Sequence, residues 1–142
     1  MSLNGRLATA VVAVVAVLVP ATLTAQDRES CSNHTLHGSY GLHATGTIID
    51  VGDFAAVGRF TFDGNGNLTG QLFVRVNGNN NELTLTGTYS VSTDCIVDDT
   101  WNFSDGSSST HKSVIVDQGK KYVILNNTEG DPSVISGEAD RQ

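Results

Sequence analysis

Apolar and polar residues alternate along most of the chain after residue 35, and clusters of Gly, Asn, Asp and Ser interrupt the alternation. A period of two is typical of strands with one buried face. No part of this region repeats its apolar residues at the 3.6-residue period of a helix. We therefore expect eight strands, at residues 36–50, 54–63, 68–77, 82–92, 96–104, 109–117, 121–127 and 133–140.

The connections between these strands are short and rich in turn-forming residues, as in "GNGN", "GNNN" and "DGSS". Short links favour antiparallel pairing of strands that follow one another in the sequence. Eight such strands can close on themselves and leave no exposed edge. The predicted fold is all-β, a single eight-stranded antiparallel up-and-down barrel.

A repeated glycine pattern supports closure of the sheet. "LHGSY" at 36–40 recurs as "LTGTY" at 85–89, and each segment places a glycine between two larger residues on one strand face. A glycine inside a strand permits the sharp coiling that a barrel wall needs. We expect a neighbouring aromatic ring, such as Tyr40 or Tyr89, to cover the gap beside it.

One face of several expected strands is almost entirely apolar, and this face should point into the barrel. An eight-stranded barrel has room for packed side chains or for one small ligand. The inward face mixes glycines with bulky side chains, which permits a cavity without requiring one. The candidates for contact with an apolar ligand are Phe60, Phe62, Leu72, Tyr89 and Trp101.

The first 25 residues have the features of a secretory signal peptide. Arg6 precedes an apolar run from Leu7 to Val19, and small residues follow. Cleavage after Ala25 is our preferred site, and Ala21 is the alternative. The apolar run is too short to cross a bilayer, which takes about 20 residues. We expect residues 26–142 to form the barrel domain, secreted to the periplasm or outside the cell.

Charge restricts the partners of the mature protein. The whole chain carries a net charge of −7, and loss of residues 1–25 removes Arg6 but none of the 15 acidic side chains. An acidic chain without a run of Lys and Arg argues against binding to nucleic acid or to an anionic membrane surface. Removal of the apolar segment also leaves few apolar residues for the core, so an interaction other than apolar burial must help to stabilise the fold.

Two cysteines can supply that help. Cys31 and Cys95 both lie in the part of the chain that would be exported, where disulfides form and persist. A bridge between them would close a loop of about 65 residues and stabilise the fold by roughly 4 kcal/mol. Free thiols and a metal site are the alternatives, but the spacing is not that of a zinc site.

Four segments carry a family resemblance: "LHGSYGLHATG", "AAVGRFTFDGNGNLTG", "LTGTYSVSTDC" and "VIVDQGKKYVIL". The chain resembles a group of small exported bacterial proteins that are uncharacterised and related to calycin-like and allene oxide cyclase-like barrels. The resemblance covers nearly the whole mature chain and implies the barrel fold and export. It implies no activity, and the catalytic residues of the plant cyclase have no matching motif here.

The segment "DGNGN" at 63–67 has two interpretations. Asp63, Asn65 and Asn67 match the first three oxygen ligands of a hand-type calcium loop. The sixth position, which needs glycine, is Leu68, and the twelfth, which needs glutamate, is Val74. Asp-Gly and Asn-Gly pairs are typical of tight hairpins. We predict a hairpin turn.

The four histidines do not predict a metal site. On one strand His37 and His43 would lie about 20 Å apart, which is too far for one metal ion. His34 falls on the opposite face from His37, and His111 is distant in sequence. We expect exposed histidines and no bound metal.

Asp99 is the residue that we single out for chemistry. Alternation places it on one face with Val97, Trp101 and Phe103. If that face points inward, a carboxyl group enters the barrel, and buried acids of this kind gather at functional sites. The alternatives are that this face meets solvent, that Asp99 lies at the rim and bonds turn amides, or that it belongs to a structural hydrogen-bonded network.

Three functions remain open. The first is a binding module with a small apolar ligand in or at the mouth of the barrel. The second is a cyclase or isomerase that uses Asp99 as acid or base, and the third is a structural or surface protein with a filled barrel. The sequence has no nucleophile motif, phosphate loop or paired-histidine zinc signature, which weighs weakly against an enzyme. We expect no cofactor, and a homo-oligomer stays open.

Overall fold

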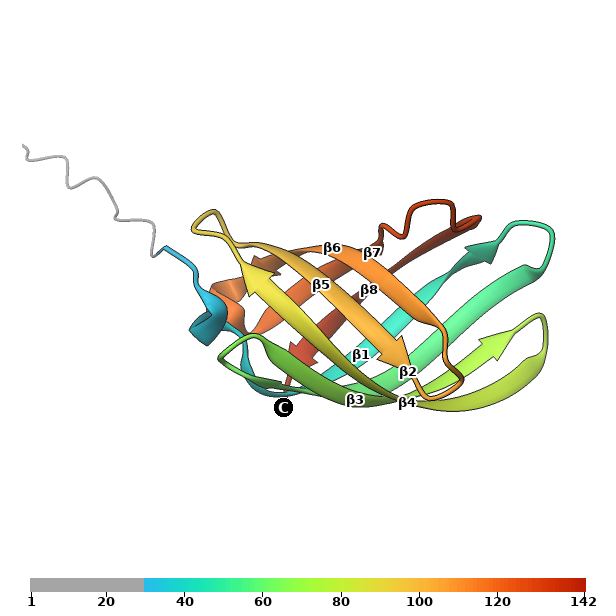
Figure 1. Cartoon of the computed structure of the whole chain (residues 1–142), viewed down its shortest axis with the longest axis horizontal. Coiled ribbons are helices and arrows are strands. Elements are labelled where there is room, and N and C mark those ends of the chain that lie inside the picture. Colours follow the sequence, from blue (N-terminus) through green and yellow to red (C-terminus); the bar gives the residue numbers. More distant parts are fainter. Residues whose placement is uncertain (1–29) are drawn as a thin grey trace, which may run out of the picture.

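Eight antiparallel strands close into a barrel in the computed structural model of the protein, which describes residues 30–142 (Figure 1). Each strand pairs with the next in sequence, and the last pairs with the first. The strands are β1 (His37–Ile48), β2 (Gly52–Asp63), β3 (Asn67–Val76), β4 (Asn79–Val91), β5 (Ile96–Phe103), β6 (Ser108–Val116), β7 (Lys121–Asn126) and β8 (Ser133–Arg141). The predicted fold is confirmed.

The expected signal peptide lies outside the described residues, so its cleavage near Ala25 stays a prediction. Within residues 30–142, no helix has the length and apolar character that a bilayer span requires.

The ends of the strands differ from prediction by a few residues. The largest shift is at the start of β4, which begins at Asn79 rather than at residue 82. The cause is a two-residue turn, in which Asn77 and Gly78 both take positive φ angles, of 44° and 85°. This geometry matches the twist of the flanking strands, so pairing resumes directly with Val76 opposite Asn79.

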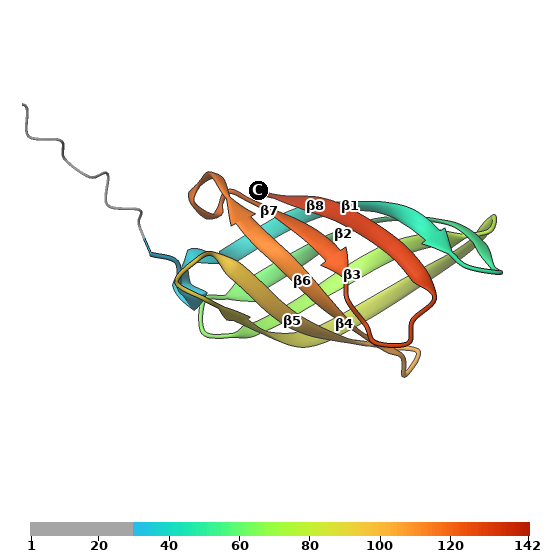
Figure 2. The same ribbon diagram turned by 90° about the horizontal axis from the view of Figure 1, so that it is seen from above.

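The two ends of the barrel are built differently. At one end, which we call the closed end, lie the short 3-10 helices η1 (Asn33–Thr35) and η2 (Asp117–Gly119) and the C-terminus, on the left in Figure 1. At the opposite end, the open end, lie the turns after β1, β3, β5 and β7, and Figure 2 shows the same division from above.

Aromatic side chains fill the closed end. The ring of Phe62 meets the rings of Tyr40, Tyr89 and Tyr122 edge to face, with centroids 5.0–5.6 Å apart. Edge-to-face packing of this kind stabilises beyond the area that it buries. The Tyr89 hydroxyl donates to the Leu36 carbonyl at 2.9 Å, which ties the residues after η1 to β4. This half of the barrel is a packed core.

The predicted disulfide between Cys31 and Cys95 is present, with Cα atoms 5.0 Å apart. Two hydrogen bonds accompany it: Cys31 N–H donates to Thr93 O at 3.3 Å, and Val91 N–H donates to Asn33 Oδ1 at 2.8 Å. The disulfide therefore fastens the segment that carries η1 to the β4–β5 connection, across the closed end.

One glycine in the wall of the barrel lies under an aromatic ring, but the glycines of the two repeated segments do not: a Cβ atom at Gly87 would meet the Thr100 carbonyl and Leu68, and nothing lies within 4 Å of one at Gly38. Gly70 on β3 is directly opposite Phe60 on β2, and a Cβ atom at Gly70 would lie 2.3 Å from Phe60 Cδ1. The covering ring at this position is Phe60, whereas we had named Tyr40 and Tyr89. Close approach of the ring to the strand is possible only because position 70 has no side chain.

The segment "DGNGN" is a hairpin turn between β2 and β3, as predicted. Asp63 Oδ1 accepts hydrogen bonds from the backbone N–H groups of Asn65 and Asn67 at 2.7 and 3.0 Å, and Asn67 Nδ2 donates to Oδ2 at 2.7 Å. Gly64 and Gly66 take positive φ angles of 78° and 110°. Because these donors stabilise the charged form, the pKa of Asp63 is lowered to about 2, with Asn67 the main cause.

Candidate functional site

The open half of the barrel contains a cavity of about 270 Å³. Most of its wall is apolar, with side chains from β1, β2, β3, β4, β5, β7 and β8. The apolar lining residues are Leu42, Ala44, Phe54, Ala56, Leu72, Val74, Leu83, Trp101, Phe103, Ile124 and Ile135. The polar lining residues include Ser109, His111 and Asn126, which lie on β6 and β7. The cavity is thus apolar with one polar wall.

Strand register gathers the polar side chains on that wall. Trp101 on β5 is directly opposite Ser109 on β6, and Asp99 is opposite His111. On the other side of β6, Asn126 on β7 is opposite His111. Residues directly opposite each other in a sheet point to the same face, so these five side chains share the inner surface of the barrel.

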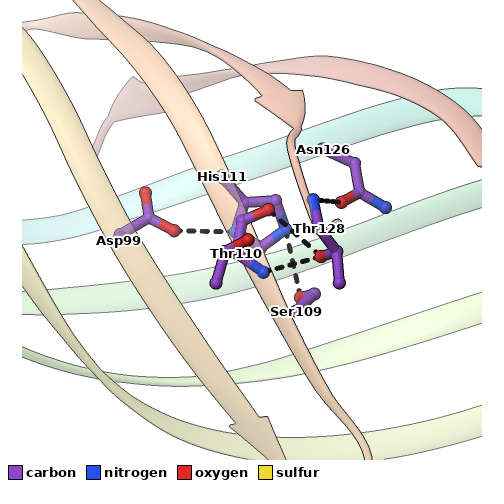
Figure 3. Close-up of polar contacts among 6 residues, drawn as sticks. All are labelled: Asp99, Ser109, Thr110, His111, Asn126 and Thr128. Atoms are coloured by element: carbon purple, nitrogen blue, oxygen red, sulfur yellow. Dashed lines mark hydrogen bonds and ion pairs between the residues drawn. The ribbon is translucent and has the colours of Figure 1, made fainter. Parts of the chain in front are cut away.

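The centre of the polar wall is a hydrogen-bonded chain of three side chains (Figure 3). The Asp99 and His111 side chains meet at 2.7 Å between Oδ1 and Nδ1. The other ring nitrogen of His111, Nε2, lies 3.1 Å from Ser109 Oγ. Asp99 and His111 are buried, with 5% and 8% of their surface exposed. A carboxylate next to Nδ1 favours the tautomer with the proton on Nδ1, which leaves a lone pair on Nε2 for the Ser109 hydroxyl.

Burial sets the proton affinity of Asp99. Desolvation raises the pKa of its carboxyl group above the ordinary value, and the hydrogen bond with His111 opposes this shift only in part. The second carboxyl oxygen, Oδ2, has no hydrogen-bond partner among the described residues, and neither do the buried hydroxyls of Ser113 and Tyr122. Burial and the nearby charge of Asp99 raise the pKa of Tyr122 well above its ordinary value. The carboxyl group therefore lies in a poorly solvated environment.

Trp101 joins the polar wall to the apolar one. Its ring centroid lies 4.1 Å from that of His111 and 4.6 Å from that of Phe60. The indole Nε1–H is buried and has no hydrogen-bond partner in the described part of the chain. A buried donor without a partner costs free energy, on the order of 1–3 kcal/mol, so a polar atom of a ligand would relieve that cost.

The β7–β8 loop holds β6 in place at the open end. Thr110 N–H donates to Thr128 Oγ1 at 2.8 Å, and Thr128 N–H donates to Asn126 Oδ1 at 2.9 Å (Figure 3). Asn126 Nδ2 in turn donates to Ser133 Oγ at 2.7 Å. These bonds hold the β7–β8 loop against the strand that carries Ser109 and His111.

The sequence-predicted ligand contacts fall into two groups. Leu72 and Trp101 line the cavity. Phe60 packs behind Trp101, and Phe62 and Tyr89 belong to the aromatic cluster of the closed end. The structure thus places two of the five candidates in the cavity lining and the other three outside it.

His111 is a site residue that the sequence did not reveal. We expected exposed histidines, and His34, His37 and His43 are exposed, but His111 is buried. The expected strands end at residue 104 and begin again at residue 109. If these two residues paired, Val114 would lie opposite Asp99 and point inward in place of His111. The actual register is shifted by an odd number of residues, which exchanges the two faces of β6. Within residues 30–142, no three His, Cys, Asp or Glu side chains are arranged to hold a metal ion.

Comparisons with known proteins show the fold and no family. The chain matches no protein-family model and no curated protein sequence. A de novo designed fluorescence-activating β-barrel is similar in structure, with a TM-score of 0.58 and 12% identity over 78% of this chain and 96% of that one. A redesigned β-barrel bound to DFHBI has a TM-score of 0.59 and 13% identity over 77% and 97%. The resemblance to calycin-like and allene oxide cyclase-like proteins is supported only as far as the eight-stranded barrel.

Proposed function

We propose that this protein binds one small, mainly apolar molecule in the open half of the barrel. The observation that carries the proposal is the cavity itself, which is apolar on most sides and has His111 and Ser109 on one wall. Ligand sites typically combine an apolar lining with a few convergent polar groups. The apolar wall would supply affinity, and the polar wall would orient the ligand.

The size of the cavity limits the ligand. An apolar cavity of about 150 Å³ holds one benzene molecule. The present cavity of about 270 Å³ therefore suits a molecule of one or two rings. A hydroxyl or carbonyl group on that molecule would find partners in the hydrogen-bonded chain of Ser109 and His111 or in the unpartnered Trp101 Nε1–H.

The similar structures support this proposal at the level of architecture. One of them is bound to DFHBI and the other is described as fluorescence-activating. A barrel of this architecture can therefore hold a small molecule. At 12–13% identity, neither the ligand nor its contacts transfer to this chain.

We further propose that the protein works after export. The Cys31–Cys95 disulfide suits an oxidising compartment, either the periplasm or the outside of the cell. The apolar run from Leu7 to Val19 is the reason to expect a cleaved signal peptide before it.

The two other functions have less support. A structural protein with a filled barrel would need side chains throughout its interior, and only the closed half is filled. A cyclase or isomerase with Asp99 as acid or base would need that carboxyl group at the cavity, but Asp99 lies behind His111 and is not part of the lining.

Adjacent alanines offer a matched test of the proposal. Ala56 lines the cavity, whereas Ala55 points to solvent from the same strand. We expect 2-naphthol to change the emission of Trp101, the single tryptophan of the chain. Ala56→Leu should weaken binding at least tenfold because it fills the cavity, and Ala55→Leu should leave it unchanged. Equal affinity in all three proteins, or no binding at millimolar 2-naphthol, would refute the proposal.

A further inference from the structure

The polar wall has the arrangement of a nucleophile, a base and an orienting acid. Ser109 Oγ lies 3.1 Å from His111 Nε2, and Asp99 Oδ1 lies 2.7 Å from His111 Nδ1 (Figure 3). A serine that can pass its proton to a histidine, which a carboxylate holds in the correct tautomer, is the general signature of an activated nucleophile. The order of the three groups here is the order that this chemistry needs.

The barrel wall holds these groups rigidly. Ser109 and His111 are two residues apart on β6, so they share a face, and Asp99 is directly opposite His111 on β5. Asp99 and His111 are both buried, which protects their hydrogen bond from water. Ser109 lines the cavity and is half-buried, so its hydroxyl can reach a bound molecule.

A donor for the developing negative charge lies beside the serine. Acyl transfer places negative charge on the carbonyl oxygen of the substrate, and a fixed N–H donor stabilises it. Trp101 is directly opposite Ser109, and its buried Nε1–H has no partner in residues 30–142. The donor and the nucleophile are therefore neighbours on the inner face.

We propose that Ser109 is the nucleophile of an esterase site that accepts small aryl or short acyl esters. The Ser109 oxygen forms a bond to the carbonyl carbon of the ester, and the hydroxyl proton moves to His111 Nε2. As the ester C–O bond breaks, His111 returns that proton to the leaving alcohol or phenol. Water then attacks the acyl-serine with His111 as base, which releases the acid and restores the Ser109 hydroxyl.

This inference rests on the proposed function, because the substrate must enter the cavity in which small molecules would bind. It adds turnover to binding, and it gives Asp99 the role of a positioning residue that acts through His111. The apolar wall would take the ring or the acyl chain of the ester.

The test uses 2-naphthyl acetate, whose hydrolysis releases fluorescent 2-naphthol. We expect the full chain to hydrolyse it, Ser109→Ala to lower the rate at least 100-fold, and Ser90→Ala, an exposed serine on β4, to leave the rate unchanged. Phenylmethylsulfonyl fluoride should add one sulfonyl group to wild-type protein, located on Ser109 by peptide mass spectrometry. This labelling requires no variant, so it does not depend on the folding of Ser109→Ala.

Two results would overturn the inference. One is hydrolysis that persists in Ser109→Ala, because Ser109 would then not be the nucleophile; its simultaneous loss in His111→Ala would assign that role to the histidine. The other is absence of both hydrolysis and labelling in the wild type. If 2-naphthol still changes Trp101 emission in that case, the esterase fails while the binding function stands, and loss of all three signals refutes both.

Discussion

The double variant Cys31→Ser, Cys95→Ser tests whether the disulfide compensates for the small number of apolar residues in the core. The two residues are 64 positions apart, so the bridge closes more than half of the barrel into one loop. The chain-entropy model assigns a loop of this length about 4 kcal/mol of stability, through restriction of the unfolded chain.

Native contacts at the closed end would also weaken. Without the bridge, the segment before β1 is held to β4 by side-chain hydrogen bonds such as Val91 N–H to Asn33 and Tyr89 O–H to Leu36, with about 1 kcal/mol each. We expect a total loss of about 2–5 kcal/mol. A protein of this size has a total stability of about 5–15 kcal/mol, so the variant should be marginal at 37 °C.

Urea denaturation of the oxidised wild type and the double serine variant measures this loss. We expect the midpoint to fall and the slope of the free energy with urea to rise, because an unbridged chain exposes more surface when it unfolds. Coincident curves for the two proteins would refute the claim that the disulfide stabilises the folded protein.

Three further predictions concern single positions. NMR titration should give Asp63 a pKa of about 2, Asn67→Ala should raise it, and millimolar calcium should leave the melting temperature unchanged; a calcium-induced rise that Asp63→Ala abolishes would contradict the hairpin interpretation. Because the folded pKa of Asp99 is raised above 3.8, wild-type stability should fall as the pH rises from there through the folded pKa. Over that pH range the urea midpoint of the wild type should therefore fall relative to the midpoint of Asp99→Asn. Parallel pH profiles for the two proteins would show that burial does not raise the pKa of Asp99. Gly70→Ala should cost about 1–3 kcal/mol in thermal unfolding, since its Cβ would meet the Phe60 ring, and an unchanged melting temperature would show that the ring moves freely.

Alternation along the chain was enough to predict the barrel and most of its inner face. Phe60, Leu72 and Trp101 all point inward because a period of two leaves only two choices for each strand, and the apolar choice is buried. The disulfide also followed from the sequence, since a chain with two cysteines allows one intramolecular pairing.

The register of β6 could not be predicted in the same way. Its outward face carries Val114 and Val116, which are as apolar as the inward face with Ser113 and His111. Hydrophobicity therefore does not choose between the faces, and the β5–β6 turn sets the register instead. The clearest signal would have been Asp99 itself, because a buried carboxyl group requires a partner on a neighbouring strand.

The difference between the two ends of the barrel was also beyond the sequence. Phe62 and Leu72 are both inward and apolar, yet Phe62 belongs to the filled half and Leu72 to the cavity. The distinction depends on η1, η2 and the C-terminus, which gather at one end only through tertiary contacts.

The location of a bound molecule tests the central claim most directly. Intermolecular nuclear Overhauser effects between 2-naphthol and the protein should connect its ring protons to the side chains of Leu72 and Trp101 in the open half. They should be absent for Phe62 and Tyr122 in the closed half. Contacts to Phe73, which is exposed on the outer face of β3, without contacts to Leu72 and Trp101 would contradict binding inside the barrel.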